Sequence, residues 1–323
     1  MKVLVTGGAG YIGSHIVDRL LAEGHHVVVV DDLSTGSRAN IQHNLSHACF
    51  DFHQGTILDK HLVSELVRGC DTIFHLAAAV GVRNIVDDPL AGITTNVHGT
   101  ERVLSAAART GAPVLLASTS EIYGKSDQLP FREDGDRVLG STSVARWSYS
   151  TAKALDEHLL YAYAARGVAG AIVRYFNSYG PRIHPAGYGS VVARFIGQAL
   201  ACRPLTIHGD GRQTRCFTFV DDTVAGTLAA AQQASTTIEA FNIGSSREIS
   251  VLELAELVLR LSGSSSRIEH VPYHTDYGAG FEDTRRRVPD VEKSRRLLGF
   301  QASIPLEDGL TRTIQWFQEA ASS

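Results

Sequence analysis

The stretch that decides the fold is Lys2-Val-Leu-Val-Thr6 followed directly by Gly7-Gly-Ala-Gly10-Tyr-Ile-Gly13. The residues before the glycines are mostly apolar or β-branched, which is typical of a buried strand. Gly7 and Gly10 permit a tight turn to which a ligand can come close, and Gly13 lets the next helix pack tightly against the strand. The stretch therefore predicts a strand, a glycine turn and a helix in direct succession.

Two carboxylates complete this unit. A second apolar strand over 27–30 leads to Asp31 and Asp32, about 20 residues beyond the turn, where a carboxylate hydrogen-bonds the ribose hydroxyls of a dinucleotide. The first N–H groups of the helix bind its pyrophosphate. Because a 2′-phosphate would meet Asp31 and no arginine follows before Arg38, the unit favours NAD over NADP. Incidental glycines in an ordinary strand-turn-helix are the alternative.

The rest of the 323-residue chain extends this pattern. Short apolar segments alternate with amphipathic ones, and they lie at 48–52, 72–76, 114–118 and 171–175. Such alternation predicts a parallel sheet with helices on both faces. The fold class expected is therefore α/β, a Rossmann-type doubly wound parallel sheet.

Prolines and glycines interrupt the alternation at 177–189, where Pro181 and Pro185 lie, and such residues break regular structure. We therefore expect an NAD-binding domain over 1–176, completed by part of 217–242. A smaller C-terminal α/β substrate-binding lobe is expected over 177–323.

Composition excludes several functions. A formal net charge of −4 argues against an electrostatic nucleic-acid binder. No apolar run approaches the roughly 20 residues that span a bilayer, and no cleavable signal precedes the first strand, so we expect a cytoplasmic protein without a membrane partner. The histidines and the cysteines lack metal-ligand spacing, so no metal and reduced thiols are expected. These cysteines are Cys49, Cys70, Cys202 and Cys216.

The second constellation is Tyr149-Ser-Thr-Ala-Lys153, with Ser118-Thr119-Ser120 at the end of an earlier predicted strand. Residues four apart project from one face of a helix, so the Lys153 ammonium is expected near the Tyr149 phenol. A phenol with a pKa of about 10 is a weak base, but a nearby ammonium and an oxidised nicotinamide favour the phenolate. A chance pair of surface residues is the alternative. The preceding dinucleotide unit favours catalysis.

These motifs together resemble the extended short-chain dehydrogenase/reductase superfamily, and within it the nucleotide-sugar epimerases and decarboxylases. The resemblance runs nearly end to end, through GGAGYIGSH at 7–15, HLAA at 75–78, TTNVHGT at 94–100, STSEIYG at 118–124, YSTAK at 149–153, RYFNSYGPR at 174–182 and PLTIHGDGRQTRCFTFVDD at 204–222. It implies an NAD cofactor, a UDP-sugar substrate and a homodimer.

Carried over by position, the resemblance implies Tyr149 as the catalytic base, Lys153 as the partner that lowers its pKa, and Thr119 as the hydroxyl near the sugar O4. The residues implied to hold the cofactor, besides Tyr149 and Lys153, are Gly7, Gly10, Tyr11, Ile12, Gly13, Asp31, Asp32, Leu76, Ala77, Ala78, Asn96, Ser118 and Tyr175. Those implied to hold the substrate are Ser120, Glu121, Asn177, Arg182, Arg215 and Arg287.

The choice of substrate depends on a carboxylate. Arg182 lies just beyond the predicted sugar site, where a guanidinium can pair with the C6 carboxylate of a uronic acid, as the resemblance to UDP-glucuronate 4-epimerases suggests. Glu121 and Arg287 match positions that UDP-glucuronate decarboxylases use, although Glu121 also suits a turn cap. Both resemblances indicate a uronic acid substrate.

We therefore expect an NAD-dependent UDP-sugar 4-epimerase that interconverts UDP-glucuronate and UDP-galacturonate through a 4-keto intermediate. A UDP-glucuronate decarboxylase giving UDP-xylose and a UDP-glucose 4-epimerase stay open. An NAD-binding module without catalysis is the alternative from another class, and the intact Thr119, Tyr149 and Lys153 argue against it.

Two predicted helices, 96–109 and 150–165, carry more small and apolar residues than one face against a sheet requires. A second apolar face suits a symmetric helix pair in a homodimer. Burial by the second lobe of the same chain is the alternative.

Overall fold

Seven parallel strands form the central sheet of the computed structural model, which describes residues 1–81, 87–184, 190–273 and 284–322. Their order across the sheet is β11-β6-β5-β4-β1-β2-β3. Their bounds are β1 Lys2–Thr6, β2 His26–Asp31, β3 Phe50–Gln54, β4 Thr72–His75, β5 Val114–Thr119, β6 Gly170–Tyr175 and β11 Ala240–Ile243. The predicted parallel, Rossmann-type sheet is confirmed.

The sequences of the strands are nearly continuous apolar runs because helices cover both faces of the sheet. In β1, Val3 and Val5 belong to one buried cluster, whereas Leu4 belongs to another on the opposite face. Successive side chains of a strand point to opposite faces, so each strand supplies both clusters.

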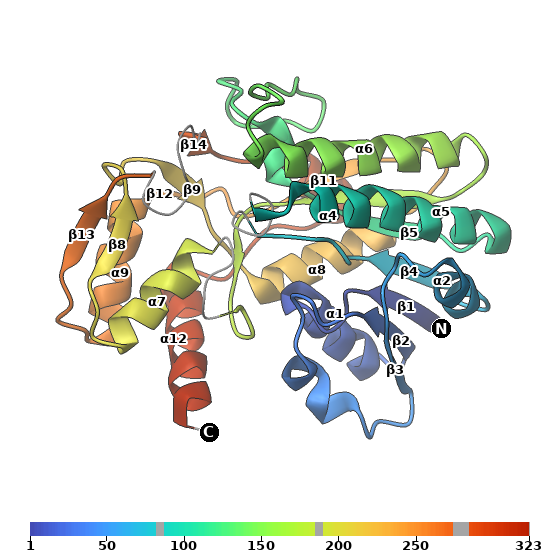
Figure 1. Cartoon of the computed structure of the whole chain (residues 1–323), viewed down its shortest axis with the longest axis horizontal. Coiled ribbons are helices and arrows are strands. Elements are labelled where there is room, and N and C mark those ends of the chain that lie inside the picture. Colours follow the sequence, from blue (N-terminus) through green and yellow to red (C-terminus); the bar gives the residue numbers. More distant parts are fainter. Residues whose placement is uncertain (82–86, 185–189, 274–283, 323) are drawn as a thin grey trace.

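Helices cover the two faces in separate layers (Figure 1). Helices α2, α5 and α6 pack together on one face, and α1 packs with α8 on the other. The bounds are α1 Tyr11–Ala22, α2 Lys60–Val67, α4 Pro89–Ile93, α5 Gly99–Thr110, α6 Arg146–Ala164, α8 Val220–Ala231 and α11 Glu292–Leu298. Short turns add η1 Arg38–Asn44, the π-helical η2 Thr94–His98 and η3 Ser120–Tyr123. The predicted helix over 96–109 thus begins earlier, because α4, η2 and α5 are continuous.

A second, smaller group of elements lies beside the carboxyl ends of the sheet (Figure 1). It contains a parallel pair, β8 with β13, and a three-stranded sheet in the order β12-β9-β14. Its elements are α7 Val191–Leu200, β8 Leu205–His208, β9 Thr214–Cys216, β12 Glu248–Ser250, α9 Val251–Ser262, β13 Ile268–Val271, β14 Arg286–Arg287 and α12 Leu306–Ser322. A further short parallel pair is β7 Ser178–Tyr179 with β10 Thr218–Phe219.

The order of the strands in the sheet determines where a ligand can bind. Strand β1 pairs with β2 on one side and β4 on the other, so the chain changes direction across the sheet at this point. Ligands of open α/β sheets bind in the crevice outside the carboxyl ends of the strands at such a switch point. None of the helices within the described ranges has both the length and the hydropathy to cross a bilayer.

Candidate active site

The glycine turn after β1 has the shape that a bound dinucleotide needs. A Cβ added at Gly13 would lie 2.1 Å from the Gly7 carbonyl oxygen, and one at Gly7 would lie 2.7 Å from the Ala77 nitrogen. Gly10 caps α1 with extended backbone and without a side-chain hydrogen bond, so the helix N-terminus keeps its donors for an anion. The turn therefore fits the pyrophosphate of NAD.

Asp31 ends strand β2 and lines the same crevice. Its carboxylate accepts hydrogen bonds from the backbone N–H groups of Ala9, at 3.0 Å, and Leu33, at 2.8 Å. Burial raises the pKa of the Asp31 carboxyl, while these two hydrogen bonds act against the shift. Its lone pairs can also serve the ribose hydroxyls, because a carboxylate accepts about four hydrogen bonds.

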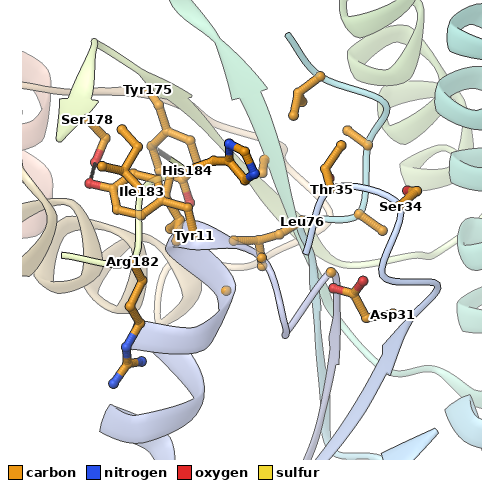
Figure 2. Close-up of a pocket in the computed structure, with 18 of the residues that line it drawn as sticks. Tyr11, Asp31, Ser34, Thr35, Leu76, Tyr175, Ser178, Arg182, Ile183 and His184 are labelled. Carbon is orange, nitrogen blue, oxygen red and sulfur yellow. Dashed lines mark hydrogen bonds between the residues drawn. The ribbon is translucent and has the colours of Figure 1, made fainter. Parts of the chain in front are cut away.

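One pocket of about 710 Å³ joins the glycine turn to the second group of elements. Figure 2 shows Asp31, Ser34 and Thr35 at one end and Tyr11, Tyr175 and His184 at the other. The predicted site residues that line it are Gly7, Gly10, Tyr11, Ile12, Gly13, Asp31, Asp32, Leu76, Ala77, Ala78, Ser118, Thr119, Ser120, Glu121, Tyr149, Lys153, Tyr175, Asn177, Arg182 and Arg287.

Two predicted site residues, Asn96 and Arg215, are buried and are not among the residues that line this pocket. The Asn96 amide accepts a hydrogen bond from the Ala79 N–H, at 2.7 Å, and donates one to the Ala79 carbonyl, at 3.2 Å. Asn96 thus fixes the loop after β4. Arg215 is buried on β9, and its Nη1 donates to the Thr214 carbonyl at 2.8 Å.

Tyr149 and Thr119 meet at the pocket floor. Tyr149 lies in the first turn of α6, Thr119 ends β5, and the Thr119 side chain hydrogen-bonds to the phenol. Burial raises the pKa of Tyr149 above its usual range, and the negative charges of Glu121 and Asp156 raise it further. The role of Lys153 and an oxidised nicotinamide in lowering this pKa stays a prediction.

Lys153 has a buried acidic partner. Its Nζ donates to Oδ2 of Asp156 at 2.8 Å, and both side chains are buried. Asp156 follows Lys153 by three residues and so lies on the same face of α6. The ammonium is therefore compensated before any ligand arrives, which sequence reasoning missed although the spacing was visible.

Glu121 lies between two buried guanidiniums. Its carboxylate is 3.1 Å from Nη1 of Arg146 and 3.8 Å from Nη1 of Arg287. Turn η3 supplies Glu121, helix α6 supplies Arg146, and strand β14 supplies Arg287. Arg146 was not among the predicted site residues, because a single arginine before the Tyr149 motif gives no signal of its own.

Arg182 forms an ion pair with helix α1. Its Nη2 is 2.6 Å from Oδ2 of Asp18 in helix α1. Figure 2 shows its side chain directed along this helix, away from Tyr175 and His184. The backbone at Arg182 is left-handed, with φ of 67°.

Other lining residues carry no local sequence signal. Ser178 lies opposite Tyr11, with 3.3 Å between the two hydroxyl oxygens, as the dashed line in Figure 2 marks. Trp316 of α12 joins the lining from the far end of the chain. Within the described ranges no group of histidine, cysteine or acidic residues is arranged to hold a metal ion.

Comparison with known proteins decides the family. The model of the NAD dependent epimerase/dehydratase family matches residues 3–244. The chain belongs to this family. The prediction of NAD as the cofactor agrees with it, as does the resemblance to extended short-chain dehydrogenases/reductases.

The family relatives are similar over nearly the whole chain. A UDP-N-acetyl-α-D-glucosaminuronate decarboxylase of Bacillus cytotoxicus is 44% identical over 98% of both chains. UDP-glucuronic acid decarboxylase 1 of Danio rerio is 38% identical over 98% of this chain and 72% of its own.

Solved structures of the family superpose closely. UDP-glucose 4-epimerase of Thermotoga maritima, solved with UDP-glucose, has a TM-score of 0.90 and 32% identity over 99% of this chain and 100% of its own. UDP-glucuronic acid 4-epimerase of Bacillus cereus, solved with UDP-glucuronic acid and NAD, has a TM-score of 0.89 and 32% identity with the same coverage. The likeness to members of this family therefore extends over nearly the whole chain.

Proposed function

We propose that the protein decarboxylates a UDP-hexuronate, with UDP-N-acetylglucosaminuronate as its preferred substrate. The observation that carries the proposal is the 44% identity with a decarboxylase of this substrate over 98% of both chains. The sequence alone favours the 4-epimerase and keeps a decarboxylase open. The decarboxylase relatives support our placing the decarboxylase first.

The pocket geometry supports a uronate. Arg287 lines the pocket beside Glu121 and Thr119, so a guanidinium is available to a C6 carboxylate near the predicted catalytic hydroxyls. Arginine binds carboxylates through two parallel hydrogen bonds. Arg182 is held by Asp18, so we assign the carboxylate to Arg287 instead.

The chemistry begins at the sugar C4. Tyr149 takes the proton of the 4-hydroxyl, and Thr119 hydrogen-bonds to the same oxygen. NAD, when bound, supplies the acceptor for the C4 hydride and later the donor that returns it. Lys153 stabilises the phenolate from one turn along α6.

The carboxylate leaves from the resulting 4-keto uronate. This compound is a β-keto acid, and it loses carbon dioxide when its C5–C6 bond aligns with the ketone. The electrons of the broken bond pass to C5 and the C4 oxygen, where the Tyr149 and Thr119 hydroxyls donate hydrogen bonds. The broken C5–C6 bond is replaced by a C5–H bond, which consumes one proton. We assign this proton to a solvent water held by the Glu121 carboxylate, because that carboxylate lines the pocket next to Thr119.

A second candidate is the 4-epimerase of UDP-glucuronate. It is favoured by the TM-score of 0.89 with the Bacillus cereus enzyme over 99% of this chain. In that reaction the protein holds the carboxylate out of alignment with the ketone, and the keto sugar turns before C4 is reduced on its other face.

The deciding experiment incubates the purified protein with NAD and, separately, UDP-N-acetylglucosaminuronate and UDP-glucuronate. Mass spectrometry and proton NMR follow the products. Loss of the mass of carbon dioxide supports the proposal, with faster turnover expected for the N-acetylated substrate. An unchanged mass with an inverted C4 signal establishes the epimerase, and unreacted substrates contradict both.

We also propose a homodimer, as the sequence predicts. Leu90 and Ile93 of α4 and Leu155 and Tyr161 of α6 are large apolar side chains with exposures between 42% and 74%. Because α4 packs against α6, they suit one apolar face. Light scattering after size exclusion tests this: twice the 34.8 kDa chain mass is expected, and a single chain mass contradicts it. The division into domains over 1–176 and 177–323 likewise stays a proposal.

A further inference from the structure

The catalytic helix carries a buried acid that the proposed reaction does not use. Asp156 is 0% exposed and its Oδ2 lies 2.8 Å from the Lys153 ammonium. Its neighbour Glu157 faces a different cation, since Glu157 binds Arg174 at 2.7 Å and 3.0 Å. Two adjacent buried carboxylates therefore have separate partners.

Polar groups from α5 and β4 lie near Asp156. Burial raises the pKa of the Asp156 carboxyl, whereas the Lys153 ammonium and the Thr100 side chain on α5 act against this shift. Thr100 is also 3.0 Å from Nε2 of His75, whose Nδ1 is 2.7 Å from the Thr6 hydroxyl at the end of β1. The Lys153 ammonium is thus the cation that the Asp156 carboxylate faces.

The charged groups that act on Tyr149, or on the Lys153–Asp156 pair beside it, come from several elements. Helix α6 supplies Lys153, Asp156 and Glu157, turn η3 supplies Glu121, and strand β4 supplies His75. Arg146 and Arg287 act on Glu121 rather than on Asp156. The neighbouring α4 and η2, which are described in full, contribute only the exposed His98. Asp156 is therefore the acid that directly offsets the catalytic cation.

We propose that Asp156 is a positioning residue, which holds the Lys153 ammonium one turn from Tyr149 and sets how much of its positive charge the phenol experiences. This inference rests on the proposed role of Tyr149 as the base. Removal of the Asp156 charge leaves the Lys153 charge uncompensated, so the phenolate becomes more stable. In agreement with this, the negative charge of Asp156 raises the pKa of Tyr149.

The test measures the phenol itself rather than turnover. The ultraviolet band of tyrosinate is titrated in NAD-saturated protein, and the same titration of a Tyr149→Phe version is subtracted. For Asp156→Asn, the midpoint is expected about one pH unit below that of the unsubstituted protein. An unchanged or higher midpoint overturns the proposal. The acid limb of kcat/KM should move by the same amount.

Glu157→Gln is the matched control. It removes the adjacent buried carboxylate and breaks the pair with Arg174, so it lowers stability while the tyrosinate midpoint should stay in place. An equal shift in this variant shows a general loss of structure and overturns the proposal. If Asp156→Asn does not fold, Asp156→Ser tests the same charge with a smaller side chain.

Failure of the proposed function gives a different result. If neither UDP-uronate reacts, the decarboxylase and epimerase assignments fall, but the tyrosinate titration still reads the effect of Asp156. If turnover is found and the midpoint does not move, the reaction stands and the role of Asp156 falls.

Discussion

Arg215 of strand β9 and Arg287 of strand β14 are direct partners in a parallel pair. Both residues are 7% exposed. Two guanidiniums at neighbouring positions of a sheet repel each other, and the Glu121 carboxylate, 3.8 Å from Nη1 of Arg287, offsets part of this repulsion. Arg287 lines the pocket, and we infer that it attracts the anionic part of the substrate.

Arg287→Met should raise KM for the UDP-uronate by about tenfold or more, because a charged hydrogen bond contributes about 1.5–3 kcal/mol. Steady-state kinetics measure the effect. Arg286→Met is the matched control on the same strand, since Arg286 is exposed and pairs with Glu248 at 2.8 Å. Equal values of KM for the two variants would contradict the assignment of Arg287.

Tyr149→Phe should lower kcat by about 10³-fold, since it removes the proposed general base. NAD binding, measured by calorimetry, should persist because the glycine turn and Asp31 are unchanged. Tyr163→Phe removes another hydroxyl of the same helix, one that donates to Glu101 at 2.9 Å, and should keep normal turnover. Appreciable turnover in Tyr149→Phe would refute the proposed base.

Arg182→Gln tests whether Arg182, rather than Arg287, binds the carboxylate of the sugar. The KM for UDP-glucuronate should stay unchanged, because Arg182 pairs with Asp18. Unfolding free energy should fall by up to about 1 kcal/mol, as for a partly exposed ion pair. If Arg182 binds the sugar carboxylate, the KM would instead rise about tenfold or more.

His75 should make the protein less stable in mild acid. Burial lowers the pKa of His75 from 6.5 to about 3, so the unfolded chain takes up a proton before the folded chain does. Stability is therefore present above about pH 6.5 and is lost as the pH falls toward about 3, by about 1.4 kcal/mol per pH unit.

Denaturant unfolding at about pH 7.5 and about pH 5 tests the role of His75. The loss of unfolding free energy should be about 2 kcal/mol larger in the natural protein than in His75→Asn. His98→Asn, at an exposed position, should keep the natural pH dependence. If His75→Asn shows the same loss as the natural protein, His75 is not its source.

Gly13→Ala should strongly reduce NAD affinity. The added Cβ would lie 2.1 Å from the Gly7 carbonyl oxygen, so the turn cannot keep its shape. Gly92→Ala is the control, because nothing lies within 4 Å of a Cβ at that helical position. Calorimetric titration compares the NAD affinities of the two variants. An unchanged NAD affinity in Gly13→Ala would contradict the proposal that the glycine turn binds NAD.

Much of the fold could be predicted from local pattern. The glycine turn, the apolar strands and the order of the first elements follow from residue spacing because each depends on neighbours close in sequence. The π-helical η2 was not predicted, since α4, η2 and α5 form one continuous helical run and no residue type marks a change of winding.

Most residues of the site could be predicted from sequence motifs, but the ion pairs that they form were not predicted. Tyr149, Thr119 and the glycines follow from motifs, and the structure brings them to one pocket. The Asp156 partner of Lys153 lies three residues away on the same helix, whereas the partner of Arg182 is set by tertiary structure. Asp18 lies 164 positions from Arg182, and nothing local favours it over a substrate carboxylate.

The position of strand β11 affects how the chain folds during synthesis and where it can be truncated. It pairs with β6 at the sheet edge, and its Asn242 binds the Phe131 and Asp290 carbonyls at 2.8 Å and 3.1 Å. A fragment ending at residue 176 would therefore expose the unpaired backbone of β6, which invites edge-to-edge aggregation. During synthesis the nucleotide fingerprint emerges first, yet the sheet that carries it closes only after residue 243.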